Sequence, residues 1–138
     1  MADIVRRIEY YSTEVPDRPG AGAGVLKALK GARVNLLAYT GFPAGAGRAQ
    51  LDFVPTRGRA FLAAARKANI KLAGPKSAFL IQGQDRVGAV ADIVTRLAEA
   101  RINVTAMDAV SAGRRRYAAI LWVKPRNVER AAQVLGAP

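Results

Sequence analysis

Asp17-Arg18-Pro19-Gly20, in the first half of the chain, recurs as Asp85-Arg86-Val87-Gly88 in the second half. Ala32-Arg33-Val34-Asn35 recurs in the same way as Ala100-Arg101-Ile102-Asn103. Both matches have an offset of 68 residues, with no insertion between them. Because two separate matches at one spacing indicate an internal duplication, the chain is predicted to contain two structural repeats.

The segments around these matches have the same order of expected elements in each copy. Short runs of apolar, β-branched and aromatic residues predict strands, and apolar residues three and four positions apart predict helices. Strands are expected at 8–15, 34–39, 49–54 and 70–73, then at 77–83, 102–110 and 117–123. Helices are expected after Gly20 and Gly88, and over 57–69 and 126–135. Candidate helix caps are Thr56, Asn127 and Gly136.

This order predicts an α+β fold of two tandem ferredoxin-like βαββαβ modules, over residues 4–74 and 75–138. Gly74-Pro75 is expected to separate them. Each antiparallel sheet would carry both helices on one face. The second module is expected to lack its last strand, because the sequence stops at Pro138. The unbroken apolar runs at 78–81 and 118–123 predict that the other sheet face is buried too, by the tandem copy and in a homodimer.

The composition excludes several classes of function. The chain has no His and no Cys, so the commonest general base, the commonest metal ligand and all thiolate sites are absent. Its ten Asp and Glu residues are dispersed. We therefore expect no catalytic residues, no metal and no cofactor. No apolar run reaches the roughly 20 residues of a membrane span or resembles a signal peptide, so we expect a cytoplasmic protein without a membrane partner.

The net charge of +12 raises the alternative of a basic, RNA-binding ferredoxin-like module. The dense cluster is Arg114-Arg115-Arg116, with Arg6-Arg7 a lesser one, and the other basic residues are scattered. The segments 48–54 and 116–122 also lack the aromatic pattern of an RNA-recognition motif. Nucleic acid is therefore not the expected partner.

The repeated turn lies between the first strand and the first helix of each copy. A helix N-terminus presents unpaired backbone N–H groups and partial positive charge, so it can receive a carboxylate where glycine allows close approach. In the alternative interpretation, Asp17 and Asp85 order the turn or cap the helix, and the glycines serve only its geometry.

Asn35 and Asn103 occupy the start of the second strand in each copy, although Asn is a poor strand residue. An amide offers both donors and acceptors, which suits recognition of the ammonium and carboxylate of an α-amino acid. A second interpretation is that each Asn supports the helix-to-strand connection in the left-handed conformation. The residues alone leave both interpretations open.

The Asp-Arg-Pro-Gly turn, the helix after it and the Asn at the second strand resemble the ACT domain, an amino-acid-sensing regulatory module. The resemblance covers about Ile8 to Leu135. It implies a ligand, an amino acid by analogy, bound between paired modules, and either a free-standing sensor or a partner of a separate protein. The implied ligand-binding residues are Asp17, Arg18, Pro19, Gly20 and Asn35, with Asp85, Arg86, Gly88 and Asn103 in the second copy. Val87 replaces the usual Pro, so the first copy is the expected site.

Overall fold

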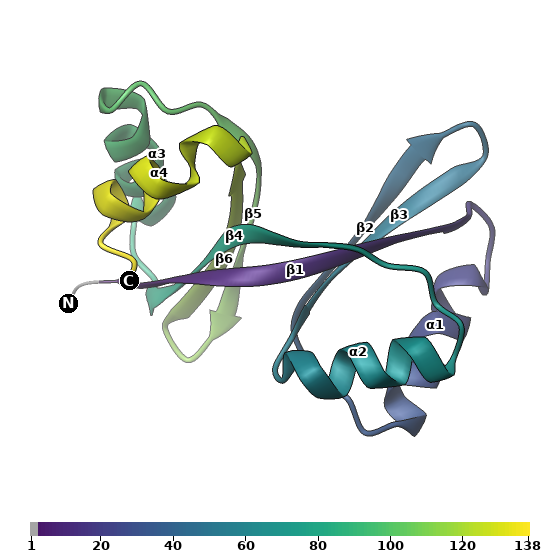
Figure 1. Ribbon diagram of the computed structural model, residues 1–138. Coiled ribbons are helices and arrows are strands. Elements are labelled where there is room, and N and C mark those ends of the chain that lie inside the picture. Colours follow the sequence, from purple (N-terminus) through teal and green to yellow (C-terminus); the bar gives the residue numbers. More distant parts are fainter. Residues whose placement is uncertain (1–2) are drawn as a thin grey trace. The chain divides into compact units, whose positions relative to one another are not determined.

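The computed structural model describes residues 3–138 and has the expected α+β fold (Figure 1). Its strands are β1 (Ile4–Pro16), β2 (Leu36–Gly45), β3 (Arg48–Pro55), β4 (Ala73–Gln84), β5 (Val104–Gly113) and β6 (Arg116–Val123). Its helices are α1 (Ala21–Gly31), α2 (Gly58–Lys67), α3 (Ala89–Glu99) and α4 (Val128–Leu135), with a 3₁₀ turn, η1 (Pro125–Asn127), before α4.

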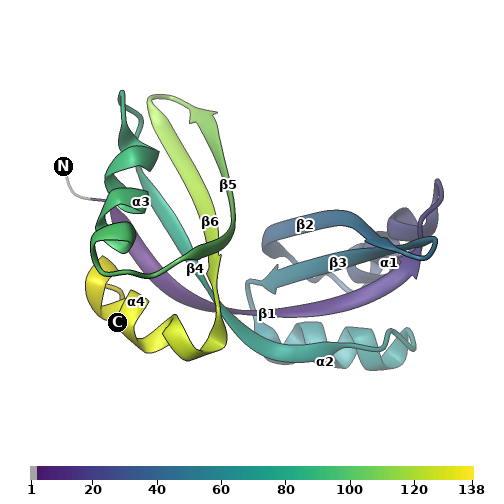
Figure 2. The ribbon, with the colours of Figure 1, turned by 90° about the horizontal axis from the view of Figure 1, so that it is seen from above.

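The chain folds into two compact units. The first unit is Tyr10–Pro75, and the second unit joins the described residues up to Glu9 with Lys76–Pro138. Neighbouring strands in the first unit follow the order β2-β3-β1-β4, and those in the second follow β1-β4-β6-β5. Figure 2 shows that the two helices of each unit lie on one side of that unit's strands.

The sequence repeat is also a repeat of hydrogen-bond register. Tyr11 lies opposite Phe53 in the first unit, and their equivalents 68 residues later, Phe79 and Leu121, lie opposite each other in the second. The antiparallel pairs β2–β3 and β5–β6 are irregular at the corresponding places, near the start of β2 and of β5. Helices α1 and α3 start and end at equivalent positions. The two copies therefore share their backbone geometry as well as their motifs.

The last strand that we expected to be missing from the second copy is replaced by the first half of β1. Residues up to Glu9 belong to the second unit, where β1 neighbours β4. Val5 is buried in the apolar core of that unit, and Arg7 forms an ion pair of 2.6 Å with Glu129 of α4. β1 is longer than the expected strand 8–15, because its first half covers an edge that would leave backbone groups unpaired.

Gly74-Pro75, expected to separate the copies, lies inside β4. β4 runs from Ala73 to Gln84, so it contributes its first residues to one unit and the rest to the other. Pro75 is tolerated because β4 is the end strand of the first unit, and an edge strand can lack a ladder donor on its free side.

The expected side-chain caps of the second helices are not formed. Arg57 occupies the N-cap position of α2, so Thr56 lies one residue too far upstream to cap the helix. The backbone N–H of Thr56 donates instead to the carbonyl oxygen of Asn35 at 3.0 Å. Asn127 precedes α4, but its side-chain oxygen accepts a hydrogen bond from Arg130 at 3.4 Å. Gly136 ends α4 with a left-handed φ of 70°, as expected.

Each unit has its own apolar core beneath its helices. In the first unit Phe61 of α2 lies between Tyr11 and Phe53, with ring centroids 5.3 and 5.5 Å away. The second core contains Phe79, Ile81, Ile93, Leu97 and Leu121. In β4 and β6 the residues that alternate with this core are buried as well, among them Leu80, Ile120 and Trp122. Both faces of these strands are therefore buried, as their unbroken apolar runs predicted.

Candidate functional site

The first turn, Asp17 to Gly20, is held by backbone hydrogen bonds. The N–H of Asp17 donates to the Gly47 carbonyl oxygen at 2.8 Å, which ties the turn to the β2–β3 hairpin. Gly20 precedes α1 with a φ of 89°, in the left-handed region that suits glycine. Within residues 3–138, the exposed side chains of Asp17 and Arg18 make no hydrogen bond or ion pair. Both are therefore available to a ligand.

Among residues 3–138, no side chain caps the start of α1. Its N-cap residue, Gly20, makes no side-chain hydrogen bond, and the first turn of the helix has no acidic residue. The N–H groups of Gly22 and Ala23 have no acceptor inside the helix, because they belong to its first turn. Together with the partial positive charge of the helix, these groups favour a bound anion.

Tyr39 on β2 is a candidate site residue that our sequence analysis missed. A Cβ atom added at Gly22 would lie 3.3 Å from the Tyr39 hydroxyl oxygen, so this hydroxyl stands against the first turn of α1. Burial raises the pKa of Tyr39, which keeps its proton available for donation. The equivalent residue, 68 positions later, is Met107. The difference between Tyr39 and Met107 at equivalent positions of the repeat was the sequence signal that could have identified this residue.

The second turn has the same backbone but different side-chain partners. Gly88 has a φ of 82°, and the Asp85 N–H donates to the Arg115 carbonyl oxygen at 2.8 Å. The Asp85 carboxylate accepts a hydrogen bond from Ser111 at 3.0 Å. Asp85 therefore orders this turn, as the purely structural interpretation expected. Asp17 has no such partner.

Arg86 is held by a carboxylate from the start of the chain. Its guanidinium donates to both oxygens of Asp3, at 3.1 and 3.2 Å, and contacts Asp92 of α3 at 3.4 Å. The Asp3 side chain is only 9% exposed. Burial acts to raise the pKa of Asp3, but the hydrogen bonds and charge of Arg86 outweigh it, so the pKa is lowered.

Tyr117 borders the same carboxylate. A Cβ atom at Gly83 would clash with the Asp3 carboxylate and lie 3.0 Å from the Tyr117 ring, so glycine leaves the room that Asp3 occupies beside β4. Burial and the neighbouring Asp3 raise the pKa of Tyr117 to about 12. The charged side chains of the second turn, Asp85 and Arg86, are thus already paired within the protein.

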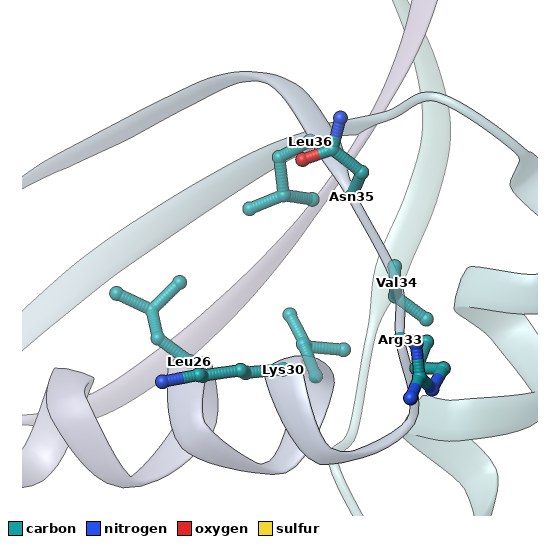
Figure 3. Close-up of a pocket in the computed structure, with 7 residues that line it drawn as sticks. Leu26, Lys30, Arg33, Val34, Asn35 and Leu36 are labelled. Atoms are coloured by element: carbon teal, nitrogen blue, oxygen red, sulfur yellow. The ribbon is translucent and has the colours of Figure 1, made fainter.

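Asn35 lines an open hollow of about 480 Å³ at the other end of α1, where β2 begins. Figure 3 shows Leu26 and Leu36 facing each other across this hollow, with the amide of Asn35 directed away from the helix. The left-handed residue of the connection is Arg33, with a φ of 60°, and Arg101 is its equivalent in the second copy. Asn35 and Asn103 are both exposed. The interpretation of these two residues as left-handed turn residues was therefore wrong.

The turn and Asn35 do not come together within one unit. They lie at opposite ends of α1, whose 11 residues span about 16 Å at 1.5 Å per residue. A small ligand at the first turn would therefore meet the turn, the start of α1 and Tyr39, but not Asn35 of the same unit. The same holds for the second turn and Asn103, which flank α3.

The architecture has close counterparts among solved structures. A protein of Bacteroides thetaiotaomicron matches with a TM-score of 0.80 at 15% identity, over 97% of this chain and 88% of that one. The regulatory subunit of aspartate kinase from Thermus thermophilus, in a ligand-free form, matches with 0.65 at 18% identity, over 99% and 95%. Aspartokinase α and β subunits match with 0.65 at 19%, over 98% and 95%. The chain has the ACT fold.

The ACT resemblance in the turn and Asn motifs is therefore confirmed at the level of fold. No family model matches the sequence, and no curated protein matches it. Within the described residues, no group of three acidic residues could hold a metal ion, and no helix is long and apolar enough to cross a membrane. The aromatic residues Phe53, Tyr117 and Trp122 on the ACT strands β3 and β6 are buried, so they offer no base-stacking surface for the RNA-recognition alternative.

Proposed function

We propose that this chain is a non-catalytic regulatory protein that binds a small carboxylate, most simply an α-amino acid, at the first turn. The observation that carries the proposal is the start of α1, which has no side-chain cap and has the Tyr39 hydroxyl against it. Beside it, Asp17 and Arg18 form no side-chain hydrogen bond or ion pair with any residue that the structure describes. The ACT fold supports it, since several solved structures of this shape are regulatory parts of aspartate kinase.

The groups at the first turn complement both charges of an amino acid. Its carboxylate would accept hydrogen bonds from the N–H groups of Gly22 and Ala23 and from the Tyr39 hydroxyl. The ammonium group would pair with Asp17, and Arg18 would add positive charge for the carboxylate. Asn35 would complete the site from a neighbouring module, because α1 separates it from the turn of its own unit.

On this proposal the two units are two ACT modules, and only the first binds the ligand. The Asp3 carboxylate already accepts hydrogen bonds from Arg86, and the Ser111 hydroxyl already donates a hydrogen bond to the Asp85 carboxylate. The second turn therefore lacks the free charges of the first. It would serve to fix the start of β1 in the second module.

Regulation requires a second protein that distinguishes the bound and unbound forms, since a ligand shifts an equilibrium only by its differential affinity. We propose that the chain acts on such a separate partner, as a homodimer that brings a second module to each first turn.

A thermal-shift screen over the common α-amino acids and related small carboxylates tests the ligand. Binding to the folded state alone stabilises it by about 2.7 kcal/mol when the ligand is at about 100 times its Kd. Asp17→Asn and Tyr39→Phe should each weaken the shift, whereas Asp108→Asn, at an exposed position of β5, should not. No shift with any compound would refute the proposed function.

A further inference from the structure

The positive charge of the chain is concentrated in the first unit. Residues 10–75 contain ten Lys and Arg but only three Asp and Glu, whereas the rest of the chain has twelve and seven. Of the three acidic residues, Asp52 is buried, Glu14 pairs with Arg48, and Asp17 lies in the turn before α1. None lies in α1 or α2.

The exposed cations on the two helices of the first unit and on their flanks form a basic surface, which we name the basic helical face. α1 and α2 pack against each other on one side of the strands (Figure 1). Positions 27 and 30, or 59 and 66, recur on one side of a helix, because they are three or seven residues apart. The residues of the face are all exposed: Lys27, Lys30, Arg33, Arg57, Arg59, Arg66, Lys67 and Lys71.

No carboxylate neutralises this face. Among residues 3–138, the ion pairs involve only Arg7, Arg48 and Arg86 on the basic side, and none of these belongs to the face. The helices of the second unit differ, because α3 and α4 contain Asp92, Glu99 and Glu129 among their basic residues. Lys30, Arg66 and Lys67 lie in the last turn of their helices, where the helix dipole favours a positive charge. The helix dipole does not explain Lys27 or Arg59, which lie outside the last turn.

We propose that the basic helical face binds the phosphate backbone of a nucleic-acid duplex without reading its sequence. A duplex carries one negative charge per about 1.7 Å of axis, which matches a row of unpaired cations. Single strands are favoured less, because they require exposed aromatic rings for stacking, and the aromatic residue of these helices, Phe61, is buried. The remaining helix surface is mostly Ala and Gly, with Leu62 exposed, so it offers little apolar area for insertion into a membrane.

This surface was not visible as a cluster in the sequence. The expectation against nucleic acid rested on scattered basic residues, with Arg114-Arg115-Arg116 as the dense run. Folding gathers cations between residues 27 and 71 on two adjacent helices and their flanks, whereas the Arg run lies in the β5–β6 connection of the other unit.

Fluorescence anisotropy with a labelled DNA duplex of about 20 base pairs, repeated with duplex RNA over a series of salt concentrations, tests the proposal. The test variant changes Lys27, Lys30, Arg57, Arg59, Arg66 and Lys67 to Gln. The matched control changes six exposed basic residues of the second unit to Gln: Arg6, Lys76, Arg101, Arg116, Lys124 and Arg126. Both variants have the same net charge.

The test variant should bind more than about 30-fold more weakly and lose about five units of the slope of log K against log salt, at roughly 0.9 per phosphate contact. The control should retain most of the slope. Equal losses in both variants, no binding by the unaltered chain, or tighter binding to phosphatidylserine vesicles than to either duplex would overturn the proposal. If the variant with six changes unfolds, the same measurement is made on a variant in which only Lys27, Arg59 and Arg66 are changed to Gln. Amino-acid binding at the first turn is measured separately and should be unaffected.

Discussion

Single side chains distinguish the two turns, which have the same backbone conformation. Gly20 and Gly88 both adopt the left-handed conformation before a helix, and both turns are tied to a hairpin. The side chains differ, since Arg86 is held by Asp3 whereas Arg18 has no partner among residues 3–138. The repeat thus preserved the geometry of the turn while its chemistry diverged.

Replacing Gly20 by Ala should lower the free energy of unfolding by about 1 kcal/mol, because a left-handed φ is costly for a residue with a Cβ atom. The matched change Gly24→Ala, inside α1 with open space around it, should instead stabilise the protein by up to about 1 kcal/mol. Urea unfolding compares the two. No loss of stability in Gly20→Ala would show that the turn does not require glycine.

Asp3→Asn should lower the stability at neutral pH, because it removes the charged acceptor of two hydrogen bonds from the Arg86 guanidinium. The folded-state pKa of Asp3 is below its ordinary value of 3.8, so its contribution is present above that pH and is lost as the pH falls through the lower folded value. The melting temperatures of the two proteins should therefore converge below about pH 4. Asp108→Asn serves as the exposed control, and a constant gap at every pH would contradict the role of Asp3.

At the scale of elements, the first half of β1 is the part that sequence patterns misplaced. The periodicity predicted the helices and most strands of both copies, because each amphipathic element carries its own local signal. The separate strands expected at 70–73 and 77–83 were wrong, since one strand, β4, runs from Ala73 to Gln84. Nothing local indicates that a strand begins in one unit and ends in the other, as β1 and β4 do. Strand partners are chosen by the whole sheet, so residues 4–9 could not be placed from their own pattern.

Val5→Ala should destabilise the second unit by about 2 kcal/mol, because two buried methyl groups leave its core. Ile4→Ala removes a β-branched side chain that is 60% exposed, so its cost should stay below about 1 kcal/mol. The fluorescence of the single Trp, Trp122 in β6, reports unfolding of this unit. Equal effects of the two changes would place residues 4–9 outside the core.

At the scale of the whole molecule, the two edge strands differ in character. β2 exposes Leu37, Tyr39 and Phe42 at 41%, 40% and 40%, beside the unpaired backbone groups of an edge. β5, the edge strand of the second unit, carries Thr105 and Asp108 at exposed positions and exposes one large apolar residue, Val110, at 62%. The apolar edge is the natural contact for the homodimer that we propose.

Sedimentation equilibrium should give twice the chain mass of 14.7 kDa. Phe42→Lys should shift the protein toward the monomer, because a charge on an edge strand opposes pairing with another chain. The equivalent change in the second copy, Val110→Lys, should leave the mass unchanged. A monomeric unaltered protein, or dissociation caused equally by both changes, would rule out a dimer through β2.

The sequence by itself determined the duplication, the order of the elements, the glycine turns before α1 and α3, and the burial of both faces of β4 and β6. Each of these follows from local spacing, which covalent geometry converts into a helix, strand or turn. Only the tertiary structure decided that Asp3 pairs with Arg86 of the second turn and that the Tyr39 hydroxyl lies near Gly22 at the start of α1. It also decided that eight cations scattered in the sequence belong to the basic helical face. These are contacts between distant segments, and they depend on which strands pair and which helices pack together.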